Sequence, residues 1–148
     1  MESLMRYINR TSRLVKLYRG VRLEPYGLSD IQHTYILNIC RNPGVPQEKL
    51  AQLIYINKSN VARQLAVLEE RGYVTRSPDP NDRRQTLVYP TEKARQILPV
   101  IQEVLNNWNA DILADFTEEE QEQLIASMEK IMTRAKAMLD TLDSDCLR

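Results

Sequence analysis

Apolar side chains recur at steps of three and four along several stretches of the 148-residue chain, a spacing typical of amphipathic helices. The first stretch predicts a helix over 3–22, with its arginines on a different face from its apolar positions. Three shorter helices are predicted over 29–41, 46–54 and 57–71, because each stretch is bounded by residues that start or stop helices. The first half of the chain is therefore predicted to be largely helical.

Several predicted helix boundaries carry a specific capping signal. Ser29 with Gln32, and Thr117 with Glu120, have the spacing of a capping box, in which each residue satisfies a backbone N–H of the other. Asn57 and Thr91 are side chains suited to the N-cap position. Gly72 suits the left-handed residue that ends a helix.

The pattern changes between residues 73 and 89, where "YVTRS" and "QTLVY" are rich in β-branched and aromatic residues and enclose the turn-forming "PDPND". This arrangement predicts a β-hairpin. A long helix is then expected from Thr91 to about Phe116, and Pro99 should kink it unless the helix starts later than Thr91. A final helix follows Thr117, with apolar positions as far as Leu142.

Three short helices and a hairpin are the components of a winged helix-turn-helix. We therefore expect one mainly α-helical domain over 1–148, with a DNA-binding lobe at about 29–92 and a small β-hairpin wing. The long flanking helices, about 1–22 and 93–145, carry more apolar surface than one small lobe needs, which predicts a symmetric homodimer. In the alternative, the two ends of the chain pack on each other within one subunit.

The net charge is zero, but the charges are segregated along the chain. Residues 1–24 carry a net charge of +4 and residues 57–95 a net charge of +3, whereas residues 103–148 carry −7. The basic stretches could face a polyanion, although a solvated helical face gives a similar count. No apolar run is long enough to span a bilayer and the N-terminus lacks the apolar core of a signal peptide, so we expect a cytoplasmic protein.

Candidate DNA contacts gather at the start of the helix over 57–71 and at the tip of the hairpin. Side chains that can donate to base edges and phosphates occupy the first two turns of this helix: Lys58, Ser59, Asn60, Arg63 and Gln64. A solvated N-terminal turn is the alternative. At the tip, Arg83 and Arg84 could reach a minor groove, while the Asp82 carboxylate steadies them.

The segments "NPGVPQEKLAQLI", "KSNVARQLAVLEERGYVTR" and "DPNDRRQTLVYPTEKA" resemble the MarR family of winged-helix transcriptional regulators, and the resemblance covers nearly the whole chain. It implies a homodimer that binds a pseudo-palindromic DNA operator, usually as a repressor released by a small ligand or an oxidant. It also implies that Arg84 enters the minor groove with Asp82 in support. The chain departs from the family pattern at Tyr55 and Ala94, where glycine is common, so the turn at Tyr55 could be looser or shifted.

Other kinds of site have less support. His33 is the single histidine, which argues against a metal centre, and no catalytic motif or cofactor-binding signature is present. Redox control through Cys40 or Cys146 is a minority hypothesis. By family likeness, a pocket for a phenolic or other aromatic effector is expected near four residues that core packing explains equally well: Arg13, Tyr18, His33 and Trp108. A rival hypothesis is a dimeric helical module that binds protein and not DNA.

Overall fold

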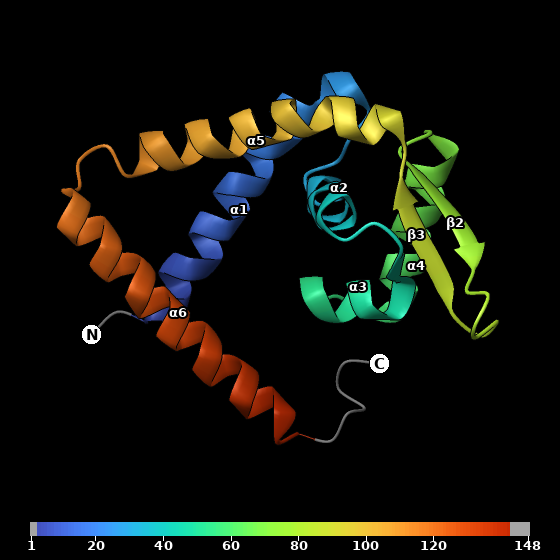
Figure 1. Cartoon of the computed structure of the whole chain (residues 1–148). Coiled ribbons are helices and arrows are strands. Elements are labelled where there is room, and N and C mark those ends of the chain that lie inside the picture. Colours follow the sequence, from blue (N-terminus) through green and yellow to red (C-terminus); the bar gives the residue numbers. More distant parts are fainter. Residues whose placement is uncertain (1–2, 143–148) are drawn as a thin grey trace. The chain divides into compact units, whose positions relative to one another are not determined.

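The computed structural model describes residues 3–142 and divides into two compact units, one up to Asn106 and one from Asn107 onward. The order of elements agrees with the predicted winged helix-turn-helix (Figure 1). In the first unit the elements are α1 Leu4–Leu23, a short 3-10 turn Glu24–Tyr26, α2 Gln32–Arg41, β1 Val45–Pro46, α3 Gln47–Ile54, α4 Lys58–Glu70, β2 Val74–Pro78 and β3 Thr86–Pro90. The helix α5 Glu92–Ile112 crosses the boundary, and α6 Glu118–Asp140 lies in the second unit.

The predicted hairpin is the larger part of a three-stranded antiparallel sheet. Strands β2 and β3 pair in the register Arg76 to Val88, and β1 adds to the other edge of β3 through Val45 opposite Val88. The sequence did not predict β1. Two residues are too few for an alternating pattern, and this strand exists only because β3 supplies its partner groups.

The core of the first unit holds the helices against this sheet. Val61, Leu65 and Leu68 are buried, which confirms the predicted inner face of α4. They pack with apolar residues from the other elements of the unit: Leu23, Tyr35, Ile36, Ile39, Leu50, Val74, Val88, Ala94 and Ile101. Because α4 buries one face completely, its opposite face is held in a fixed orientation toward solvent.

Thr91 joins the hairpin to the two helices at its base. Its hydroxyl donates to the carbonyl oxygen of Gly72 over 2.6 Å and accepts from the N–H of Ala94 over 3.3 Å, which confirms the predicted cap of α5. The backbone N–H of Thr91 donates to the carbonyl oxygen of Tyr73. Gly72 has a φ of 81°, which is the left-handed conformation predicted just after the end of α4.

Besides the Thr91 cap of α5, the predicted capping signals were confirmed at α4 and α6 and only partly formed at α2. The Asn57 side chain accepts from the N–H of Asn60, and Thr117 and Glu120 form the predicted capping box. At α2, Gln32 accepts from the Ser29 N–H, but the helix starts at Gln32 and no side chain caps it. The predicted start at residue 29 was therefore wrong. Residues 29–31 form a turn, in which the Gln32 N–H donates to the Ser29 carbonyl oxygen.

Helix α5 differs from its prediction at its C-terminal end. It continues as one helix through Pro99 but ends at Ile112, so Phe116 lies in the connection to α6 and not in the helix as predicted. The side-chain amide of Gln121 donates to the carbonyl oxygens of Leu113 and Phe116. These bonds satisfy carbonyl groups that a continuing helix would have paired internally.

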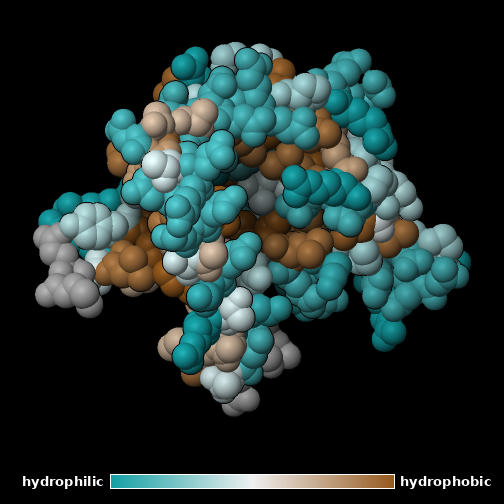
Figure 2. All heavy atoms as spheres, turned by 60° about the vertical axis from the view of Figure 1, so that its left-hand side comes forward, coloured by the Kyte–Doolittle hydropathy of each residue, from teal (hydrophilic) through white to brown (hydrophobic). Residues whose placement is uncertain are grey.

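The long helices leave much apolar surface exposed. Hydrophobic residues are visible among the hydrophilic ones on the face of the molecule drawn in Figure 2. Among the described residues α6 buries none, and α1 buries only Leu23. The exposed apolar side chains of α1 are Leu4, Met5, Tyr7, Leu14, Leu17 and Val21, and those of α6 and the segment just after it are Leu124, Ile125, Met132, Met138, Leu139 and Leu142. Within residues 3–142, no helix combines the length and the apolar character needed to cross a membrane.

Candidate nucleic-acid interface

A tight turn connects α3 to α4. Tyr55 takes the left-handed conformation, with φ 56° and ψ 44°, and the N–H groups of Tyr55 and Ile56 both donate to the carbonyl oxygen of Ala51. The possibility of a looser turn is therefore not realised, because Tyr55 adopts the backbone conformation that glycine takes most easily.

The first turn of α4 places the predicted DNA-contacting side chains at the surface. The hydroxyl of Ser59 and the backbone N–H of Asn60 both donate to Asn57 Oδ1, over 2.9 and 2.8 Å. Asn60 is half-buried, and its own Oδ1 is buried without a hydrogen-bond partner in the described structure. Arg63 is exposed, one turn further along, and has no hydrogen-bond or ion-pair partner within residues 3–142.

Gln64 differs from the other four predicted DNA contacts on α4 because its side chain bonds to another helix. It is half-buried, and its Oε1 accepts from the side-chain amide of Gln32 on α2 over 3.0 Å. Gln32 is only 4% exposed, and its own Oε1 also accepts from Ser29 and Arg71. The structure thus connects Gln64 with α2 and leaves its amide NH₂ as the group able to donate elsewhere.

The tip of the hairpin is organised around Asp82. Its Oδ1 accepts from the backbone N–H and from Nε of Arg84, both over 3.1 Å, and its Oδ2 accepts from NH2 of Arg84 over 3.4 Å. These bonds from Arg84 lower the pKa of Asp82. The Arg84 side chain is nevertheless 91% exposed, so its guanidinium is both oriented and accessible. Arg83 beside it is exposed as well.

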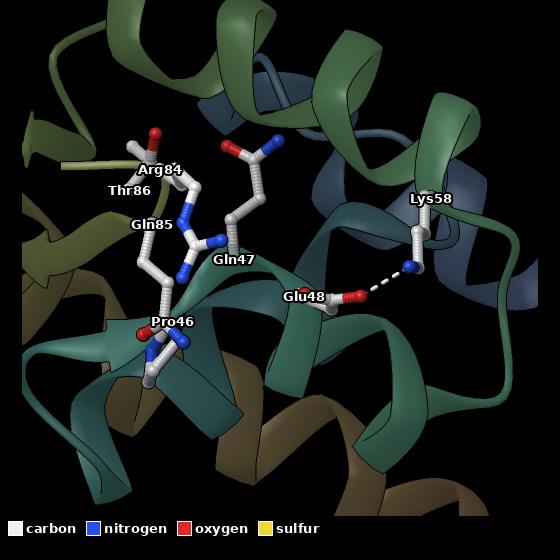
Figure 3. A pocket seen from close by; sticks show the side chains of 7 residues that line it. All are labelled: Pro46, Gln47, Glu48, Lys58, Arg84, Gln85 and Thr86. Carbon is white, nitrogen blue, oxygen red and sulfur yellow. Dashed lines mark hydrogen bonds and ion pairs between the residues drawn. The ribbon is translucent and has the colours of Figure 1, made fainter. Parts of the chain in front are cut away.

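Lys58 and Arg84 line one surface hollow, although they come from different elements (Figure 3). The hollow lies where the starts of α3 and α4 approach the wing, and it is lined by Pro46, Gln47, Glu48, Lys58, Arg84, Gln85 and Thr86. In it the Lys58 ammonium donates to Oε1 of Glu48. Sequence reasoning missed Glu48, whose only signal was an acidic side chain in the first turn of a helix, where the helix dipole favours it.

The residues predicted for an effector pocket come from α1, α2 and α5. His33 is buried; Nε2 of its ring lies 3.3 Å from NH1 of Arg19 and 3.2 Å from Oγ1 of Thr34. Burial and the charge of Arg19 lower the pKa of His33 to about 4, so the ring is neutral near pH 7. Arg19, which the sequence did not single out, also has a buried Nε without a partner in the described structure.

The other candidate residues within 3–142 are exposed or half-buried. Tyr18 is half-buried, with Arg22 over its ring; Arg13 is exposed; and Trp108 lies in the second unit. Cys40 is half-buried, and burial raises its pKa, which makes the reactive thiolate scarcer. Cys146 lies outside the described residues. Within residues 3–142, no group of three or more potential metal ligands comes together.

Comparison with known proteins agrees with this geometry. The family model described as the MarR family matches residues 26–85, which include the helix-turn-helix, β2 and the tip of the wing. A solved structure titled "Crystal Structure of MarR" is 30% identical, with a TM-score of 0.84, and the match covers 93% of this chain and 94% of that one. The chain belongs to the MarR family. This is a family of winged helix-turn-helix transcriptional regulators and not of enzymes.

Two further relatives of this MarR-family chain extend the comparison. An uncharacterized HTH-type transcriptional regulator, YybA of Bacillus subtilis, is 28% identical over 131 residues, which are 88% of this chain and 87% of YybA. A putative MarR-family regulator from Listeria monocytogenes, solved in complex with a 26mer DNA, is 28% identical with a TM-score of 0.85. That match covers 90% of this chain and 89% of the Listeria protein.

Proposed function

We propose that this chain is a homodimeric repressor that binds a pseudo-palindromic operator in duplex DNA and responds to a small aromatic effector. The observation that carries the proposal is the position of Lys58 and Arg84, which line one hollow although α4 and the wing supply them separately. A cation at the start of α4 and another at the wing tip suit a helix in the major groove and a hairpin in the adjacent minor groove.

In this proposal, base reading falls to the start of α4. Lys58 and Arg63 offer cationic donors to guanine, and the Asn60 side chain would pair with adenine after a rotation that exposes its buried Oδ1. Ser59 and Gln64 add polar groups at the same end of the helix, and Arg83 adds a phosphate contact at the wing. Arg84 enters the minor groove with its guanidinium already oriented by Asp82, which reduces the side-chain entropy lost on binding.

The exposed apolar surface of α1 and α6 supports a homodimer. Helix α6 has 23 residues and buries none of them. Because amphipathic helices owe most of their stability to packing, α6 is expected to pack against a further surface. A second copy of the chain supplies the missing surface under two-fold symmetry. Two lobes would then address half-sites about one helical turn apart, roughly 34 Å.

The environment of His33 and Arg19 supports an effector site in the first unit. Arg19 offers a buried Nε–H that lacks an acceptor, and a phenolate or aromatic carboxylate would provide one. Tyr18 precedes Arg19 in α1, and Tyr18, Arg13 and Trp108 remain further candidates for contact with the effector. An effector that binds one dimer geometry better than another would shift the population that fits DNA.

The test is a titration of duplex DNA with the full-length chain at several salt concentrations. DNA binding through several phosphates predicts that affinity falls by orders of magnitude between about 50 and 200 mM salt. A footprint on the DNA upstream of the chain's own coding region then locates the operator. If the chain has no affinity for duplex DNA even at low salt, the proposal fails and the rival protein-binding module is favoured.

A further inference from the structure

The hollow between the wing and α4 contains a negative charge on a surface that is proposed to face DNA. Glu48, the second residue of α3, pairs with Lys58, the first residue of α4 (Figure 3). Both side chains remain more than half exposed, at 54% and 62%. A DNA backbone that enters this hollow therefore meets a carboxylate as well as two cations.

We infer that Glu48 is a specificity-determining residue, which lowers the affinity of this chain for non-cognate DNA by neutralising Lys58. The inference rests on the proposed function, DNA binding through α4 and the wing. It deepens that function, because it concerns the choice between DNA sequences and not the ability to bind.

The argument starts from the ammonium group of Lys58. It has three N–H donors, one of which is used by Glu48, so two remain for DNA. Where a base edge offers acceptors at the right place, Lys58 contacts them and keeps Glu48 as a partner. Where the base edge offers no acceptor, Lys58 can contact only phosphates, and the carboxylate of Glu48 beside it repels the same phosphates. Glu48 thus penalises binding that depends on phosphates alone.

A role in folding explains the Glu48–Lys58 pair less well than a role in DNA discrimination does. Exposed pairs of this kind contribute little to folding, since water and salt screen them. Glu48 also lies in the first turn of α3, where the dipole favours an acid, but that effect does not require Lys58. A role in folding alone would therefore leave DNA discrimination unchanged when Glu48 is replaced.

Asp82 provides a contrast on the same surface. It is two residues from Arg84 and holds the guanidinium through backbone and side-chain bonds, so it orients a cation within one turn. Glu48 holds its cation from a different helix, ten residues away in sequence. The Glu48–Lys58 pair can therefore separate without any change in the turn that carries either residue.

The experiment compares Glu48→Gln with the wild-type chain on two duplexes of equal length and composition. One duplex is selected from a random library by the wild-type protein, and the other is its shuffled version. We expect Glu48→Gln to bind the shuffled duplex about tenfold more tightly and the selected duplex less than threefold more tightly. The slope of log affinity against log salt on the shuffled duplex should steepen by about 0.9, the value for one additional phosphate contact.

Three controls separate the possible causes. Glu70→Gln makes the same charge change at the other end of α4 and should leave the discrimination ratio unchanged. Glu48→Asp keeps the carboxylate and should retain most of the discrimination. In a Lys58→Gln background, Glu48→Gln should add no further gain, because the cation on which Glu48 acts is absent.

The outcomes distinguish this inference from the proposed function. If the wild-type chain binds duplex DNA but Glu48→Gln behaves like Glu70→Gln, or tightens binding to both duplexes equally, the role of Glu48 is disproved and DNA binding stands. If the wild-type chain binds no duplex, both are disproved. Circular dichroism of each variant shows whether α3 and α4 remain folded.

Discussion

The side-chain amide of Gln32, near the start of α2, donates to Oε1 of Gln64 on α4 over 3.0 Å. Gln32 is buried and its carbonyl oxygen accepts from Ser29 and Arg71, so one side chain connects three segments of the lobe. His33, which contacts Arg19 of α1, is the next residue on α2. The orientation of α4 thus depends on a polar contact beside the buried histidine.

Replacement of Gln32 by Leu removes this contact at nearly constant volume. It leaves Gln64 Oε1 and the Ser29 N–H without their partner, which should lower the free energy of unfolding by about 1–3 kcal/mol. Urea denaturation of the single variants and of the double variant with Gln64→Leu measures the coupling, which we expect to be about 1 kcal/mol. A coupling near zero would show that the bond does not hold α4 in place.

Replacement of Arg84 by Ala tests the wing. The exposed guanidinium contributes little to the core, so the thermal midpoint should stay unchanged while operator binding weakens by about 1–3 kcal/mol. Asp82→Asn keeps the cation but removes the carboxylate that orients it, and the loss should be smaller than for Arg84→Ala. Gel-shift titrations check both variants. Unchanged affinity for Arg84→Ala would remove the wing from the interface.

His33 predicts a dependence of stability on pH. Its pKa is about 4 in the folded chain and about 6.5 when unfolded, because burial and then the Arg19 charge disfavour the protonated ring, despite opposing effects of Asp30. As the pH falls from 6.5 toward 4, the unfolded chain therefore takes up a proton that the folded chain does not.

The free energy of unfolding should consequently decrease by about 2–3 kcal/mol across this pH range, relative to a chain without the histidine. Well above pH 6.5 the ring is neutral in both states and contributes no pH dependence. Urea denaturation of the wild-type chain and of His33→Gln, at intervals of half a pH unit, measures the difference. Parallel pH profiles for the two proteins would contradict the prediction.

Met132 tests whether α6 lies at a subunit interface. A Met132→Lys substitution places a charge on the exposed apolar face of α6, and we expect dimer dissociation to become at least tenfold easier. Sedimentation equilibrium over a range of concentrations measures the dissociation constant. Gln123→Lys, at an exposed polar position of the same helix, serves as the matched control. Equal dissociation constants for both variants would place the dimer contact elsewhere.

Much of the fold followed from local chemistry in the sequence. Asn57 and Thr117 cap their helices through side chains within three residues of the N–H groups they satisfy, so the signal lies within one short segment. The hairpin and the buried face of α4 were likewise evident from residue type and spacing. Strand β1, in contrast, depends on β3 more than 40 residues away, and its two residues carry no pattern of their own.

The candidate site could be predicted only in part, for the same reason. Residues 58–64 and 82–84 were identified because each group is continuous in sequence. The contacts of Lys58 with Glu48, of Gln64 with Gln32 and of His33 with Arg19 each join two different helices. Their partners are fixed by how the helices pack, which a list of helical segments does not define.

The hydrogen bonds of Thr91 have a consequence for motion in the lobe. One residue attaches the end of β3 to Gly72, just beyond α4, and to Ala94 in the first turn of α5. A rotation of α5 about Thr91 should tilt the hairpin as well, because Thr91 is the single residue between the end of β3 and the start of α5. Position 91 is therefore a pivot, and small angular changes in the long helix would appear as larger displacements at the arginine-bearing tip.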